Sequence, residues 1–156
     1  MKIKILVDLD VVTVGSWDKG SNGDLARKLM SRLKNKEFYL VTPFYLLEHV
    51  LKWENQWLKE SIENFYLKCS DLLLTNDDID AKIEDRNIDD KNILLGLQSH
   101  NIKEEDSFIV LVTALFDLDY LITFNRVHLK NKKKIISEVL KENGLKQINI
   151  AGPEEV

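Results

Sequence analysis

Two aspartates near the N-terminus stand where ionised carboxylates are uncommon. Asp8 and Asp10 lie in the stretch ILVDLDVV, with apolar residues on both sides. In an extended strand, a period of two would place both side chains on the same face. Carboxylates in such surroundings lose hydration worth several kcal/mol unless a cation or hydrogen-bond donors replace it. The pair therefore predicts a site whose chemistry depends on the other polar residues that meet it.

Four polar positions fall at expected strand ends or early in the helices that follow them, namely Asp8, Glu48, Asp106 and Asn125. Each alone is better explained by an ordinary role, as a turn former, a solvated helix residue or a carboxylate favoured by a helix N-terminus. Two carboxylates about 5 Å apart repel by roughly 3 kcal/mol at an effective dielectric near 20. If the three acids converge, they need a divalent cation or must take up protons. Oxygen-only ligands suit Mg²⁺ or Mn²⁺, so Asp8, Glu48 and Asp106 are the candidate metal ligands.

A basic run, RVHLKNKKK, follows Asn125 directly and contains no acid. Such a run is by default a solvated face, but next to a site of this kind it could hold backbone phosphates. The candidate substrate-binding residues are Thr123, Arg126, Lys130, Lys132, Lys133 and Lys134. His128 in the same run is more often a surface or half-buried residue than a catalytic base.

Composition limits the setting in which such a site would work. The chain has 156 residues, 44% of them hydrophobic, which predicts one globular domain over residues 1–156. Its net charge of -4 argues against a general DNA-coating protein. Cys69 is the only cysteine, so nothing indicates an oxidising compartment. The apolar run 108–116 is too short to span a bilayer, and we expect a cytoplasmic protein with no membrane contact.

The order of expected elements alternates strands with helices. We expect strands over 2–7, 37–41, 71–75, 119–123 and 147–150, and a loop over 15–23. We expect helices over 24–35, from 42 towards 69 with a break near Asn55, two between 77 and 100, one over 104–116 and one over 132–144. Thr42 could cap the second helix, with Pro43 in its first turn. This order predicts a three-layer α/β/α fold with a central, mainly parallel sheet and its site at the carboxyl ends of the strands.

The order of these motifs resembles that of the PIN-domain family of metal-dependent ribonucleases. The resemblance is carried by ILVD with Asp8, VTPFYLLEHV with Glu48, DSFIVLVTA with Asp106, and LITFN with Thr123 and Asn125. The closing INIAGPEEV also resembles the last strand and tail of that family. The sequence departs from the pattern at Leu9, where Ser or Thr is usual, and at Asn125, where many members have an acid.

The resemblance implies an endoribonuclease that uses Mg²⁺ or Mn²⁺ to hydrolyse single-stranded RNA. Asp8, Glu48, Asp106 and Asn125 would then be the catalytic residues. It also implies a role either as the toxin of a toxin-antitoxin pair, with an antitoxin protein as partner, or in RNA processing. A homodimer is expected, formed through the helices that carry Trp53 and Trp57, although a stripe of this kind more often belongs to the core.

Two other functions remain open from the sequence. ILVDLDVVT also resembles the start of a haloacid-dehalogenase phosphatase, with Asp8 as nucleophile, Asp10 as acid and Thr42 as a hydroxyl. That family needs a late acidic pair after a strand, which LITFN does not supply, and a small Gly where Val11 stands. A degenerate PIN domain that only binds RNA or protein is the third alternative, which Asn125 makes credible.

Overall fold

A sheet of five parallel strands forms the centre of the computed structural model, which describes residues 1–156. The strands are β1 (Lys4–Val7), β2 (Tyr39–Pro43), β3 (Leu72–Leu74), β4 (Tyr120–Ile122) and β5 (Ile150–Ala151). Their order across the sheet is β3-β2-β1-β4-β5, so β1 is the central strand. All four pairings are parallel. The expected five strands and the parallel sheet are therefore confirmed.

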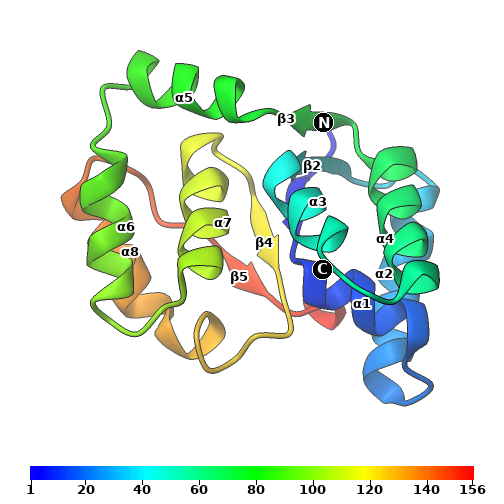
Figure 1. Ribbon diagram of the computed structural model, residues 1–156. Helices are drawn as coiled ribbons and strands as arrows, with labels where there is room; N and C mark the ends of the chain where they lie inside the picture. Colours follow the sequence, from blue (N-terminus) through cyan, green and yellow to red (C-terminus); the bar gives the residue numbers. More distant parts are fainter.

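Helices cover both faces of this sheet and give three layers (Figure 1). They are α1 (Leu9–Trp17), α2 (Ser21–Lys34), α3 (Phe44–Leu51), α4 (Gln56–Cys69), α5 (Asn76–Asp85), α6 (Asp90–Gln98), α7 (Glu104–Leu115) and α8 (Lys133–Glu142). Short 3-10 helices span Lys130–Lys132 and Pro153–Glu155. In Figure 1, α1, α2 and α4 gather on one side of the strands, and α6, α7 and α8 on the other. The three-layer α/β/α prediction is confirmed.

One hydrophobic cluster of 40 buried residues runs through both helix layers and the sheet. Ile5, Leu6 and Val7 of β1 are all buried in it. Helix α7 is buried from Ser107 to Leu115 apart from Phe108, as expected for a segment that is apolar nearly all round. Burial on both faces explains why β1 reads as a continuous apolar run.

The segment after β1 differs from its expected structure. The strand ends at Val7, Asp8 takes the N-cap position of α1 in an extended conformation, and Asp10 lies in the first helical turn. The expectation that Asp8 and Asp10 share one face of a strand is therefore wrong. Helix α1 is favoured by its close packing against α2. Gly15 allows this close approach, because a Cβ at this position would lie only 3.1 Å from the Cβ of Ala26. Helix α2 also begins three residues earlier than expected, at Ser21.

The chain around α3 and α4 confirms one prediction and corrects two. The break near Asn55 is present, and the Asn55 side chain caps α4 by accepting a hydrogen bond from the Leu58 N–H. Thr42 does not cap α3, because β2 continues through Pro43 and the Thr42 hydroxyl bonds Ser70 instead, at 2.7 Å. Trp57 does not belong to the core, since it is 63% exposed, whereas Trp53 packs against the core in part.

None of the helices combines the length and the apolar character that crossing a membrane would require.

Candidate functional site

Asp8 stands at the carboxyl end of the central strand, and its backbone is held from two sides. Its N–H donates to the carbonyl of Ile122 in β4, at 2.8 Å. The buried hydroxyl of Tyr66, from α4, donates to the carbonyl of Val7, also at 2.8 Å. These bonds fix the end of β1 between a neighbouring strand and a helix of the adjacent layer. The carboxylate of Asp8 therefore projects from a rigid support.

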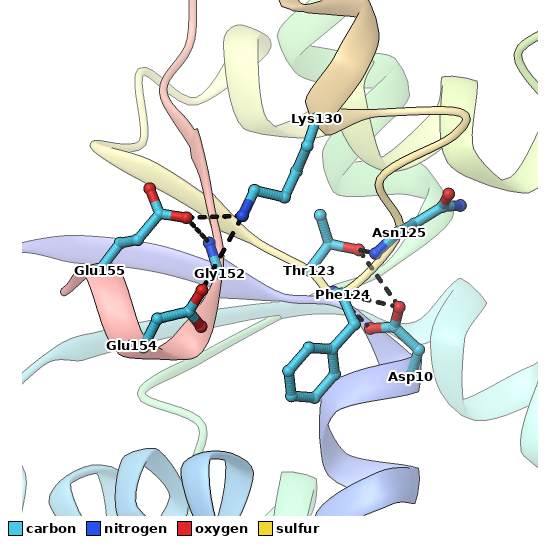
Figure 2. A network of polar contacts seen from close by, with 8 residues as sticks. All are labelled: Asp10, Thr123, Phe124, Asn125, Lys130, Gly152, Glu154 and Glu155. Carbon is cyan, nitrogen blue, oxygen red and sulfur yellow. Dashed lines mark hydrogen bonds and ion pairs between the residues drawn. The ribbon is translucent and has the colours of Figure 1, made fainter. Parts of the chain in front are cut away.

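Thr123, directly after β4, joins Asp8 to Asp10. Its hydroxyl lies 2.8 Å from Asp8 Oδ2 and 3.3 Å from Asp10 Oδ2. The Phe124 N–H also donates to Asp10, at 3.2 Å to Oδ2, as Figure 2 shows. A hydroxyl has one proton, so it can donate to only one of the two carboxylates at a time. The two acids are thus adjacent and share a single hydroxyl donor.

This arrangement makes both carboxylates reluctant to ionise. Burial, followed by the negative charge of Asp10, raises the pKa of Asp8 to about 8. Burial likewise raises the pKa of Asp10 to about 6, opposed by the hydrogen bond from Phe124. Neither residue takes part in any of the salt bridges of the chain. Neither carboxylate therefore has a cationic side chain of this protein to stabilise its ionised form.

Asn125 brings Asp106, from the first turn of α7, into the same group. The Asn125 Nδ2 donates to Asp106 Oδ2 at 3.0 Å, while Asn125 Oδ1 accepts from the His128 N–H at 3.0 Å. The Asn125 N–H donates to the Thr123 hydroxyl. Burial raises the pKa of Asp106, and the nearby His128 lowers it. The amide of Asn125 thus presents its donor to Asp106 and uses its oxygen to close the turn that follows.

The acids open into one cavity of about 390 Å³. Three of the four catalytic candidates, namely Asp8, Asp106 and Asn125, line this cavity as expected. The cavity wall also contains Asp10, which the sequence paired with Asp8, and four residues that the sequence did not single out for this site, namely Trp17, Trp53, Lys103 and Glu105. The signal that could have found Trp17 is its spacing of seven residues from Asp10, which puts both on one face of a helix. That signal was hidden because residues 9–17 were not expected to be helical.

Glu48 is the catalytic and metal-binding candidate that the structure does not bring to this cavity. It lies in the middle of α3, is exposed, and does not line the cavity. The buried face of α3 carries Leu46, Leu47 and Val50, and Glu48 falls outside it. The glutamate that does line the cavity is Glu105, in the first turn of α7.

The basic run lies next to the site in sequence, but several of its cations already have partners. Lys130 Nζ lies 2.6 Å from Glu155 and 4.0 Å from Glu154, as Figure 2 shows, and its side chain is only 16% exposed. This hydrogen bond holds the pKa of Glu155 below its usual range. Lys132 donates to the carbonyl of His100.

The remaining members of the run are more open. Arg126 is exposed. Lys133 and Lys134 line a different cavity, of about 450 Å³, beside β5. Thr123, the other substrate-binding candidate, is fully buried and bonded to the acids. Because its hydroxyl contacts the carboxylates of Asp8 and Asp10, Thr123 is better suited to orienting these acids than to contacting a substrate.

The donor atoms at this site are of the kind that hard divalent ions prefer. No three His, Cys, Asp or Glu side chains are arranged as a ready metal centre. Mg²⁺ commonly uses only one or two carboxylates and takes its other ligands from water and substrate phosphates. Asp8 and Asp10, with Asp106 in the same cavity, fit that mode because they are oxygen donors and none of the three takes part in a salt bridge.

Comparisons with known proteins do not assign the chain to a class, since the sequence matches no protein-family model and no curated protein.

Proposed function

We propose that the protein is a divalent-metal-dependent endoribonuclease of the PIN-domain type that cleaves single-stranded RNA. One observation carries the proposal. Asp8 and Asp10, Asp106, and Asn125 come from three distant parts of the chain and line one cavity at the carboxyl end of the central strand. This convergence agrees with the order of motifs in the sequence, and parallel sheets commonly place their sites at this edge.

The residues of the chain would divide the work as follows. Asp8 and Asp10 would hold a Mg²⁺ or Mn²⁺ ion, with Asp106 as the third acid. Thr123 and the Phe124 N–H orient the first two carboxylates, and Asn125 orients the third. The chemistry that phosphodiester hydrolysis needs from the ion is neutralisation of phosphate charge and easier deprotonation of the attacking water. Glu48 has no part in this version of the site.

The narrower roles rest on the sequence resemblance alone. A toxin would have an antitoxin protein as its partner, whereas an RNA-processing enzyme would not need one. A homodimer is likewise part of the proposal that the resemblance carries.

Incubation with a single-stranded RNA and, separately, with a phosphomonoester tests the reaction type, each with Mg²⁺, Mn²⁺ or EDTA. We expect cleavage of RNA with either ion, no cleavage with EDTA, and no release of phosphate from the monoester. Asp106→Asn keeps the shape of the side chain but removes a ligand charge, so kcat/KM should fall on the order of 100-fold or more. Glu104→Gln is the matched control, since it removes a carboxylate from an exposed position on the same turn of α7.

Three results would contradict the proposal in different ways. Hydrolysis of the monoester that depends on Asp8 would favour the phosphatase. RNA binding without cleavage under any metal condition would favour the degenerate domain. Cleavage by Asp106→Asn as fast as by Glu104→Gln would mean that the reaction takes place elsewhere on the molecule.

A further inference from the structure

The acidic cavity has two tryptophans in its wall. Trp17 is the last residue of α1, and Trp53 lies in the turn between α3 and α4. Trp53 packs in part against the core, whereas Trp17 is 59% exposed. An indole that remains this exposed loses the stabilisation that burial would give it. Two of the three tryptophans of the chain are thus beside the carboxylates, with ring surface open to a ligand.

The position of Trp17 relative to the acids follows from the geometry of α1. Asp10, Thr13 and Trp17 are spaced three, four and seven residues apart, so they share one face of the helix, and all three line the cavity. Seven residues at 1.5 Å each place Trp17 about 10 Å along the helix from Asp10. In a stacked strand with about 3.4 Å between nucleotides, this distance corresponds to roughly three nucleotides, and to fewer in an extended strand.

The cavity offers a polyanion few cationic side chains, so an apolar contact would add binding that these side chains do not supply. Asp8, Asp10, Glu105 and Asp106 line it, with Lys103 as the one lysine or arginine. The neighbouring Lys130 is already occupied by Glu155. Stacking of bases on aromatic rings is independent of this charge and tolerates every base.

We propose that Trp17 and Trp53 form a stacking platform for unpaired bases, which holds a single-stranded nucleic acid in register with the acids. The proposal rests on the proposed function for its ligand, a single strand whose phosphate lies at the carboxylates. Trp17 and Trp53 are specificity-determining residues in this arrangement, because a duplex offers no free base faces to stack. The strand runs along the α1 face from Asp10 to Trp17.

Binding of a short oligoadenylate measures the platform separately from cleavage. Asp106→Asn serves as the background in which RNA stays intact, with Mg²⁺ present, and the quenching of tryptophan fluorescence reports stacking. Adding Trp17→Ala should weaken binding by about 5- to 150-fold, the usual range for one lost base stack. Trp17→Phe retains a ring and should restore most of the affinity. An oligomer of the same length without bases should bind weakly and equally to all variants.

Trp57→Ala is the matched control, because Trp57 is 63% exposed on α4 and does not line the cavity. It should bind oligoadenylate like the parent. If Trp17→Ala and Trp57→Ala bind equally well, the platform is wrong. If Trp17→Ala instead turns a dimer into a monomer in sedimentation while RNA affinity is unchanged, Trp17 is a subunit contact and the proposal is also overturned.

The two proposals fail separately. RNA cleavage by the parent at a rate that Trp17→Ala does not change would overturn the platform and leave the nuclease intact. Binding that depends on Trp17, in a parent that cleaves no RNA with any metal ion, would overturn the nuclease and support the platform.

Discussion

Two regions with acidic side chains lie at the same end of the sheet, and they differ in whether these side chains have cationic partners. At the end of β1, the carboxylates of Asp8 and Asp10 have no cationic partner, and their pKa values are raised. At the C-terminus, Glu155 accepts hydrogen bonds from Lys130 and from the Gly152 N–H, and its pKa is lowered. Figure 2 shows Asp10 of the first region and Lys130 and Glu155 of the second, on either side of Thr123.

The difference separates a region suited to binding from one suited to holding the fold. Carboxylates that are already paired and bonded have little left to offer a ligand. Carboxylates that are buried together at a cost in free energy are stable only because the surrounding fold holds them, and they gain most when a cation binds. The following predictions test this contrast, from the largest expected effect to the smallest.

Asp8→Asn should remove a dependence of stability on pH. The pKa of Asp8 is about 8 in the folded protein against an ordinary value of 3.8, so between these values the folded state holds more protons than the unfolded state. Stability should therefore fall as pH rises from about 4 to 8, by on the order of a few kcal/mol in EDTA. Asp8→Asn cannot ionise, so its loss over the same range should be smaller. Urea unfolding across this range measures both proteins.

Asp80→Asn, which changes an exposed acid on α5, is the control and should keep the pH profile of the parent. Adding Mg²⁺ at pH 8 should stabilise the parent more than Asp8→Asn, because an ion that binds only the folded state shifts the equilibrium towards it. Identical pH profiles for Asp8→Asn and the parent would show that ionisation of Asp8 does not cause the loss of stability at high pH.

Asn125→Asp tests the contrast by adding a charge to the unpaired region. The change replaces the Nδ2 donor, 3.0 Å from Asp106 Oδ2, with a carboxylate oxygen, so it turns a hydrogen bond into a repulsion. Without metal the variant should lose about 1–3 kcal/mol of stability, and Mn²⁺ should restore more of it than in the parent. The Mn²⁺ concentration for half-maximal RNA cleavage should fall.

Thermal unfolding and cleavage, each titrated with Mn²⁺, measure the two effects of Asn125→Asp. Asn143→Asp is the comparison at the C-cap of α8, where the Asn143 side chain also bonds locally, to the carbonyl of Val139. Superimposable metal titrations for Asn125→Asp and the parent would place Asn125 outside the metal site.

Lys130→Gln tests the paired region and should have the smallest effect. It removes the ion pair with Glu155, which is partly exposed, so the loss of stability should be about 1 kcal/mol or less and should shrink at high salt. RNA cleavage should be nearly unchanged, because Lys130 is not free to bind phosphate. Lys28→Gln, on the exposed face of α2, is the control in the same unfolding and cleavage assays. A large rise in KM for Lys130→Gln alone would assign Lys130 to the substrate instead.

The sequence was a good guide where one local pattern dominated. Helix α7 was predicted from its apolar run, and the break near Asn55 was predicted as well, although the cap that Asn55 forms there was not. The apolar run before Asp8 predicted β1 and the position of Asp8 at its carboxyl end. The sequence placed Glu48 with the other acids, but the structure does not. The apolar spacing around Glu48 predicts a helix, whereas the rotation of α3 about its axis, which decides the face that carries Glu48, depends on packing against the rest of the fold. Asn125 was placed correctly, but the direction of its amide depends on His128 and Asp106.

By itself, the sequence determined the alternation of strands and helices, the parallel sheet that this alternation requires, and the acids at its carboxyl edge. Only the tertiary structure decided that residues 9–17 form a helix. The run Val11, Val12, Thr13 and Val14 favours a strand by local propensity, but its buried side chains and the close approach of Gly15 to α2 outweigh that preference. Because residues 9–17 are helical, Asp10 lies beside Asp8, and Trp17 lines the same cavity. Local preferences amount to fractions of a kcal/mol per residue, and contacts between distant segments are worth more.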